Sequence, residues 1–187
     1  TADMAQWTQH QRLDRYQRAR EELWMTGLAY HCTCSRTQWN AFTGDSCPGE
    51  CRQGNHAFQV GRTATRLHLD GIPDHIIWRR DDLPAYHLTS IVDDCDGRID
   101  LVVRGEDLAS STDVQRRVSH LMPGNTFHQA HVLHHPLVTS KGRKLSKSAG
   151  AQASPLTLSH ELRATVSDVA ATYSASAQAD LLRSREC

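Results

Sequence analysis

The chain of 187 residues is long enough for one ordinary α/β domain, or for one domain with a small appendage. Its 21 Lys and Arg balance its 21 Asp and Glu, and its 39% of hydrophobic residues can supply a core, which disfavours wholesale disorder. A formal net charge of zero removes any attraction of the whole molecule to nucleic acid or anionic lipid. Phosphate recognition therefore has to come from local clusters of Lys and Arg.

The sequence favours a soluble, cytoplasmic protein with no membrane partner. No window approaches the roughly 18 apolar residues of a membrane span, and the first residues do not resemble a secretory signal. Because the chain starts at Thr1 rather than Met, we expect a processed or partial chain. In a reducing compartment, clustered thiols hold a metal more often than they pair with each other.

The first half of the chain predicts a helix followed by two strands. Residues 5–25 contain no Pro or Gly and place their apolar side chains at spacings of three and four, and Gly27 is a suitable stop. The alternation in Thr65–Leu69 predicts a half-buried strand that ends in a turn at Asp70–Gly71. His75–Trp78 predicts a second strand.

The second half predicts alternating strands and helices. Strands are expected at Leu88–Val92, Ile99–Val103 and His131–Val138, helices at Ser110–Met122 and Ser159–Ala170, and a polar loop at Thr139–Ser148. This alternation favours an α/β fold with parallel strands near residues 99 and 132.

Four of the six cysteines form two close pairs, Cys32-Thr33-Cys34 and Cys47-Pro48-Gly49-Glu50-Cys51. Four thiolates in this pattern can surround a structural, tetrahedral Zn²⁺. Residues 32–54 are too poor in aliphatic side chains to hold their shape by burial, so a metal would supply the folding free energy. Unrelated thiols, or one or two disulfides, are the alternative. Cys95 and Cys187 are expected to be ordinary thiols.

A second cluster, Lys141–Ser148, carries four cationic side chains in seven positions. Ammonium groups on a Gly- and Ser-containing loop suit a polyphosphate that gathers negative charge in its transition state. A solvated basic loop is the alternative interpretation.

Three ordered motifs carry a family resemblance. Lys144-Leu145-Ser146-Lys147-Ser148 resembles the KMSKS signature of class I aminoacyl-tRNA synthetases, with Leu in place of Met. Residues 85–94 and 102–108 resemble the glutamate-specific members of that class, as do residues 11–16 and 27–36. The zinc spacing and the short tail of 39 residues after Ser148 resemble the glutamyl-Q tRNA(Asp) synthetase family, over roughly residues 9–150.

This resemblance implies the second half of a class I synthetase Rossmann-type nucleotide fold with an inserted zinc-binding subdomain. The implied organisation is a helix of the catalytic core at 1–28, the zinc-binding insertion with connecting strands at 29–80, the second half of the Rossmann-type domain with the KLSKS loop at 81–150, and a short helical tail at 151–187.

The resemblance also implies a ligase that activates glutamate with ATP and Mg²⁺ and transfers it to the queuosine base in the anticodon of tRNA(Asp). Tyr86 and Arg104 match the family's glutamate-binding residues, and a guanidinium fork suits a carboxylate. Lys147 matches the lysine that contacts ATP, and Lys144 and Ser146 are expected to act beside it. The matching zinc ligands are Cys32, Cys34, Cys47 and Cys51, with Cys47 at a position where relatives can carry Tyr.

The sequence departs from the family pattern in one respect: it contains no HIGH-type motif, whose histidines and helix N-terminus meet ATP phosphates in class I enzymes. We therefore expect a partial enzyme that lacks the N-terminal half and is inactive alone, with a fragment of glutamyl-tRNA synthetase, or pairing with a separately encoded half, as related possibilities. The alternative from another class is a non-catalytic, zinc-stabilised tRNA-binding or regulatory module. Such a module would use Arg62, Arg66, Arg79 and Arg80, unless these charges form a solvated face.

Two further groups of polar residues are expected to be structural. Adjacent residues on a strand point to opposite faces, so Asp93 and Asp94 are interpreted as structural or turn residues rather than as an acid/base pair. His134 and His135 are expected to be packing or surface residues.

Overall fold

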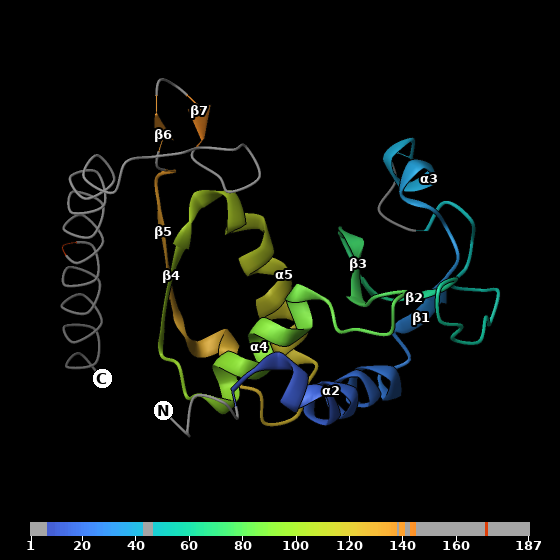
Figure 1. Cartoon of the computed structure of the whole chain (residues 1–187), viewed down its shortest axis with the longest axis horizontal. Helices are drawn as coiled ribbons and strands as arrows, with labels where there is room; N and C mark the ends of the chain where they lie inside the picture. Colours follow the sequence, from blue (N-terminus) through green and yellow to red (C-terminus); the bar gives the residue numbers. More distant parts are fainter. Residues whose placement is uncertain (1–6, 43–46, 138, 141–142, 145–170, 172–187) are drawn as a thin grey trace. The chain divides into compact units, whose positions relative to one another are not determined.

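The computed structural model describes residues 7–42, 47–137, 139–140, 143–144 and 171, which form parts of two compact units (Figure 1). Unit 1 comprises residues 1–99 and 113–129, and unit 2 comprises residues 100–112 and 130–187. Among the described residues, no helix combines the length and apolar character that crossing a bilayer requires.

Unit 1 contains most of the helices that the structure describes. In chain order its elements are η1 (Gln9–Arg12), α2 (Leu13–Met25), β1 (Ala29–Cys32), α3 (Arg36–Asn40), β2 (Ala64–Leu69), β3 (Ile72–Trp78), α4 (Tyr86–Asp96) and η3 (Phe127–Gln129). Helix α5 (Ala109–His120) begins in unit 2 and ends in unit 1. The helix predicted at Ser110–Met122 is therefore confirmed, and Val118 on its apolar face is fully buried.

The helix predicted at residues 5–25 is confirmed over η1 and α2. Tyr16, Ala19 and Leu23, spaced by three and four residues, are fully buried because they share one face of α2. The helix ends where Gly27 adopts φ of +72°, a left-handed conformation that a side chain would disfavour.

Strands β1, β2 and β3 form an antiparallel sheet in that order. The two strands predicted at Thr65–Leu69 and His75–Trp78 are confirmed as β2 and β3, joined by a turn in which Gly71 has φ of +75°. Strand β1 adds an edge that sequence reasoning missed, and it places Tyr30 opposite Arg66. This pairing fixes the first cysteine pair against the sheet.

The strand predicted at Leu88–Val92 is wrong, because these residues lie in helix α4. Leu88, Ile91 and Val92 are fully buried, and their spacing of three and one places them on one helical face. The side chains are β-branched in part, but burial of this face outweighs their preference for strands.

Asp93 on α4 joins this helix to α2, so its structural interpretation is confirmed although the strand argument for it is wrong. The buried hydroxyl of Tyr16 donates to both carboxylate oxygens of Asp93, at 2.8 and 2.9 Å. Arg12 donates from Nε to Asp93 at 2.8 Å and from its terminal nitrogen to Asp96 at 2.7 Å. Burial and the Asp93 carboxylate raise the pKa of Tyr16 to about 12, so the phenol remains a donor.

Unit 2 contains a parallel pair of strands, as predicted near residues 99 and 132. Its elements are β4 (Leu101–Gly105), η2 (Glu106–Leu108), β5 (His131–His135), β6 (Thr139–Ser140) and β7 (Arg143–Lys144), besides the start of α5. Strands β4 and β5 are parallel, and β6 and β7 form an antiparallel pair. The helix expected at Ser159–Ala170 lies outside the described residues.

Candidate functional site

The four paired cysteines converge in unit 1, as their spacing predicts. Their sulfur atoms all lie within 4.8 Å of one another, and the four side chains are buried. The sulfur of Cys34 lies 3.4 Å from that of Cys47 and 3.7 Å from that of Cys51. Four sulfur atoms about 2.3 Å from a tetrahedral metal lie about 3.8 Å apart, so the donor set and its spacing fit Zn²⁺. The four cysteines are free in this structure, which favours the metal interpretation over the disulfide alternative.

Local backbone features shape the segment around these thiols. After Cys34, Ser35 begins helix α3 with a capping box, in which Ser35 and Gln38 each accept from the other's backbone N–H. In the second pair, a Cβ atom on Gly49 would lie 2.6 Å from the Cys34 sulfur, so the close approach requires glycine. The cap thus shapes the chain that leaves the first pair, and the glycine inside the second pair leaves room for the Cys34 sulfur.

The pKa values of Cys34, Cys47 and Cys51 differ from their ordinary values, and the shifts indicate how a cation would act on the cluster. Burial, followed by hydrogen bonds that the Cys34 thiol donates to Cys47 and Cys51, raises the pKa of Cys34, and burial also raises the pKa of Cys47. The pKa of Cys51 is lowered to about 6: burial acts in the opposite direction, but hydrogen bonds from Thr33 and the other thiols stabilise the Cys51 thiolate. A bound cation would stabilise all four thiolates together.

The two expected glutamate-binding residues belong to different units. Tyr86 is the first residue of α4 in unit 1 and is 48% exposed, and its ring lies beside that of His87. Arg104 lies in β4 of unit 2 and is 9% exposed. Tyr86 can thus meet a solvent-borne ligand, and Arg104 offers a desolvated guanidinium.

Arg104 belongs to a polar cluster that sequence reasoning missed. Its guanidinium donates to the Thr112 hydroxyl at the start of α5. The same hydroxyl lies 2.8 Å from Nε2 of His134 and donates to the carbonyl of Leu108 at 3.2 Å. Arg104 and His134 are paired in the parallel register of β4 and β5. The two parallel strands predicted from the sequence could have suggested this contact if their register had been considered. His134 is therefore part of the environment of Arg104 rather than an isolated packing residue.

The expected phosphate-binding loop is described only in part. Lys144 ends strand β7, whose backbone pairs with β6. Ser146 and Lys147 lie outside the described residues, so their expected contacts with ATP stay predictions.

Comparison with known proteins identifies the family. Residues 60–160 match the family model for the catalytic domain of class I tRNA synthetases (E and Q). The chain belongs to this family. Curated relatives of this synthetase chain include proteins named Glutamyl-Q tRNA(Asp) synthetase from Pseudomonas putida KT2440, 35% identical over 159 residues, and from Pseudomonas aeruginosa PAO1, 36% identical over 159 residues. Each alignment covers 75% of this chain.

The same alignments cover 52% and 53% of the two relatives, so the synthetase chain spans about half of their length. Among solved structures, a glutamate tRNA ligase from Elizabethkingia meningosepticum matches with a TM-score of 0.52 and 20% identity, covering 76% of this chain and 36% of the ligase. A glutamate-tRNA synthetase from Elizabethkingia anophelis matches with a TM-score of 0.53. These structures support the class I catalytic fold, with its mixture of helices and strands.

Proposed function

We propose that the protein containing this chain activates glutamate with ATP and Mg²⁺ and transfers it to the queuosine base of tRNA(Asp). The similarity to two Pseudomonas proteins named Glutamyl-Q tRNA(Asp) synthetase, at 35% and 36% identity over 75% of the chain, carries this proposal. The ordered Tyr86, Arg104 and Lys144–Ser148 motifs agree with it.

In this proposal, Arg104 binds a carboxylate of glutamate and Tyr86 adds a hydrogen bond. The guanidinium of Arg104 is oriented by the Thr112 hydroxyl, and a held guanidinium loses less conformational freedom when it binds a carboxylate. Lys147 neutralises the phosphates of ATP, with Lys144 and Ser146 beside it. Charge neutralisation of this kind stabilises the transition state of adenylate formation.

We further propose that Cys32, Cys34, Cys47 and Cys51 hold a structural Zn²⁺. Four thiolates close the coordination sphere, so the metal would stabilise the fold and would not bind substrate. The buried residues that gather around this site are Tyr30 and the cysteines themselves, with Trp39 packed against them. Because so little aliphatic surface is buried here, metal binding would supply much of the local folding free energy.

The test is glutamate-dependent exchange of pyrophosphate with ATP, followed by transfer of labelled glutamate to RNA. In an active preparation containing this chain, Arg104→Ala should raise the KM for glutamate by about 10- to 100-fold, the cost of a lost charged hydrogen bond. Lys147→Ala should slow adenylate formation without changing the melting temperature. Arg18→Ala, an exposed change on α2, is the control and should alter neither. Unchanged kinetics in both test variants would contradict the assigned roles.

The acceptor is tested separately from activation. We expect glutamate on tRNA(Asp) that carries queuosine and none on tRNA(Asp) that lacks it, whereas charging of tRNA(Glu) would indicate a glutamyl-tRNA synthetase instead. We expect no exchange from the 187-residue chain alone, since it contains no HIGH-type sequence.

A further inference from the structure

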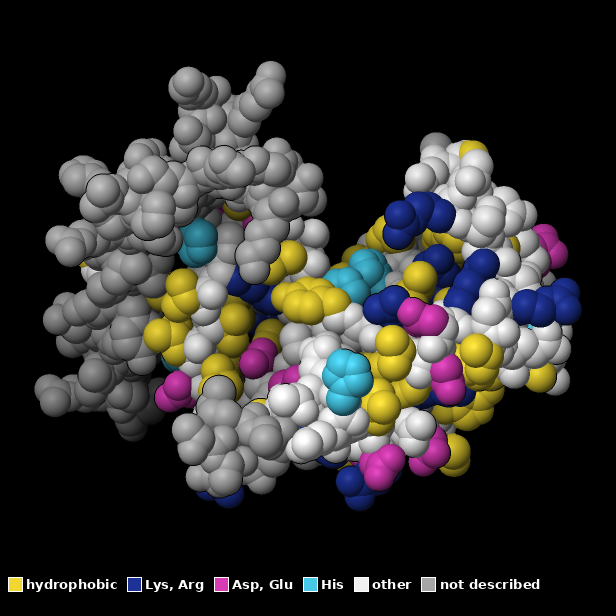
Figure 2. Space-filling model, in the orientation of Figure 1, with side chains coloured by type: hydrophobic (Ala, Val, Ile, Leu, Met, Phe, Trp, Pro, Cys, Tyr) yellow, Lys and Arg dark blue, Asp and Glu magenta, His cyan; other side chains and the backbone are white. Residues whose placement is uncertain are grey.

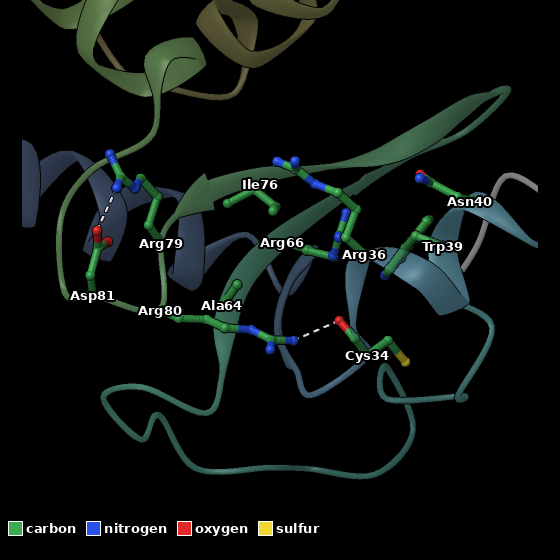
Figure 3. Close-up of a pocket in the computed structure, with 10 residues that line it drawn as sticks. All are labelled: Cys34, Arg36, Trp39, Asn40, Ala64, Arg66, Ile76, Arg79, Arg80 and Asp81. Carbon is green, nitrogen blue, oxygen red and sulfur yellow. Dashed lines mark hydrogen bonds and ion pairs between the residues drawn. The ribbon is translucent and has the colours of Figure 1, made fainter.

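A cavity of about 600 Å³ in unit 1 is lined by four arginines, and we name it the arginine pocket (Figure 3). Its charged residues are Arg36, Arg66, Arg79, Arg80 and Asp81, beside Trp39. They come from helix α3, strand β2 and the segment that follows β3. Figure 2 shows basic side chains gathered on this part of the molecule.

The arginine pocket carries more positive charge than the carboxylates of the described residues neutralise. Arg79 forms an ion pair with Asp81. Within the described part of the chain, no carboxylate lies within 4.0 Å of the guanidinium of Arg36, Arg66 or Arg80. Three arginines without a carboxylate partner therefore face one concave surface, an arrangement that attracts an anion.

Arg66 is the least solvated of these arginines, with 9% of its surface exposed. Its guanidinium lies 3.8 Å from the centre of the Trp39 ring and donates to the carbonyl of Asp74 at 2.8 Å. Within the described residues, neither the buried Nε–H of Arg66 nor the buried indole N–H of Trp39 has a hydrogen-bond partner. A buried charge with donors left unsatisfied is costly, and an oxyanion in the pocket would offset that cost.

The pocket is also held in a fixed shape by the cysteine segment. Arg80 donates to the carbonyl of Thr33 at 2.9 Å and to that of Cys34 at 2.6 Å (Figure 3). Trp39, which supports Arg66, packs against the cysteines. The guanidinium groups are thus partly ordered in advance, which reduces the entropy lost when a ligand binds.

We infer that the arginine pocket binds backbone phosphates of an RNA strand; the choice of RNA rests on the proposed function. Guanidinium groups recognise phosphate through paired N–H donors. Arg66 covers one face of Trp39 and the cysteines pack against the residue, so the indole offers no free platform for a base. The pocket therefore positions RNA through its backbone and does not read its sequence.

Substitutions at two exposed residues should change the RNA affinity in opposite directions. Arg36→Gln removes one cation from the pocket, and Asp81→Asn removes its carboxylate and releases Arg79 from the ion pair. Arg18→Gln on α2 removes an arginine that is also exposed but lies outside the pocket, and it serves as the matched control. Circular dichroism verifies that each variant is folded.

The probe is a fluorescent RNA hairpin with the anticodon arm of tRNA(Asp), titrated by anisotropy at several salt concentrations. Arg36→Gln should weaken binding about tenfold at low salt and reduce the slope of log K against log salt by about 0.7 to 0.9, the loss of one phosphate contact. Asp81→Asn should tighten binding. Arg18→Gln should leave affinity and slope unchanged.

Inorganic phosphate, titrated in a second arm, distinguishes an RNA site from a small-anion site. Weak competition by phosphate, with variant effects on RNA as above, supports the inference. Tight phosphate binding with unchanged RNA affinity in Arg36→Gln and Asp81→Asn would overturn the RNA assignment. Equal losses in Arg36→Gln and Arg18→Gln would indicate diffuse attraction and would also overturn it. Glutamate-dependent exchange is measured without RNA in the same preparation that serves the kinetic test above, not in the 187-residue chain alone, so its failure there would count against the proposed function and not against the RNA site.

Discussion

Replacing Cys34 by Ser should remove metal from the cysteine cluster. The sulfur of Cys34 lies against two of the other three, at 3.4 Å from Cys47 and 3.7 Å from Cys51, so its loss opens the coordination sphere. Structural zinc binds with an apparent free energy of about 10 to 16 kcal/mol, or about 2.5 to 4 kcal/mol for each of four thiolates. The dissociation constant should therefore rise by about 70- to 900-fold.

The assay is zinc content together with zinc titration against a chromophoric chelator. Cys95→Ser is the control, since Cys95 lies outside the cluster and its sulfur contacts the Gly124 carbonyl at 3.7 Å. In Cys34→Ser, hydrogen exchange should quicken in residues 32–54 and much less in α2, whose core contacts do not involve the cluster. Full zinc content and unchanged affinity in Cys34→Ser, equal to those of Cys95→Ser, would refute the assignment of Cys34 as a ligand.

Three other changes test the packing and electrostatics around the site. Gly49→Ala should lower zinc affinity, because its Cβ would lie 2.6 Å from the Cys34 sulfur; chelator competition measures this, and wild-type affinity would contradict the close approach. Tyr16→Phe should lower the free energy of unfolding in urea by about 1.5 to 3 kcal/mol, because Asp93 loses a charged hydrogen bond, and a neutral result would show that Arg12 compensates fully. Burial lowers the pKa of His75 below its ordinary value of 6.5. As the pH falls below about 6.5, the unfolded chain therefore binds a proton at His75 more readily than the folded chain does. The free energy of unfolding is not reduced by this effect above about pH 6.5 and decreases as the pH drops below it. His75→Gln should flatten that fall in melting curves, and an unchanged pH profile would exclude His75 as its source.

The cysteine cluster and two of the turns were predictable from sequence because their signals are local, whereas β1 and α3 beside the cluster were not predicted. Two cysteine pairs separated by a polar segment require a common partner, and the structure brings all four sulfur atoms within 4.8 Å. The stop at Gly27 and the turn at Gly71 were predictable for the same reason, since each depends on a positive φ that glycine adopts readily.

Helix α4 was mistaken for a strand because a short apolar run carries no clear period by itself. Leu88–Val92 contains β-branched residues and has strand length, which favours the wrong choice. The correct signal extends beyond the run: Leu88, Ile91 and Val92 match a helical face that continues toward Asp93, where the carboxylate meets α2. The partners Arg12 and Tyr16 lie 81 and 77 positions earlier, so no local window could reveal that contact.

The arginine pocket shows the same limit for a functional surface. Sequence reasoning grouped Arg62 with Arg66, Arg79 and Arg80 as the residues that a tRNA-binding module would use. In the structure Arg62 does not line the pocket and Arg36 does. Arg36 reaches it because helix α3 begins directly after the first cysteine pair, so its position depends on closure of the cysteine cluster and on the pairing of β1 with β2. The charged residues of such a pocket can be counted from sequence, but which of them face one cavity depends on the tertiary contacts that fold the cysteine segment onto the sheet.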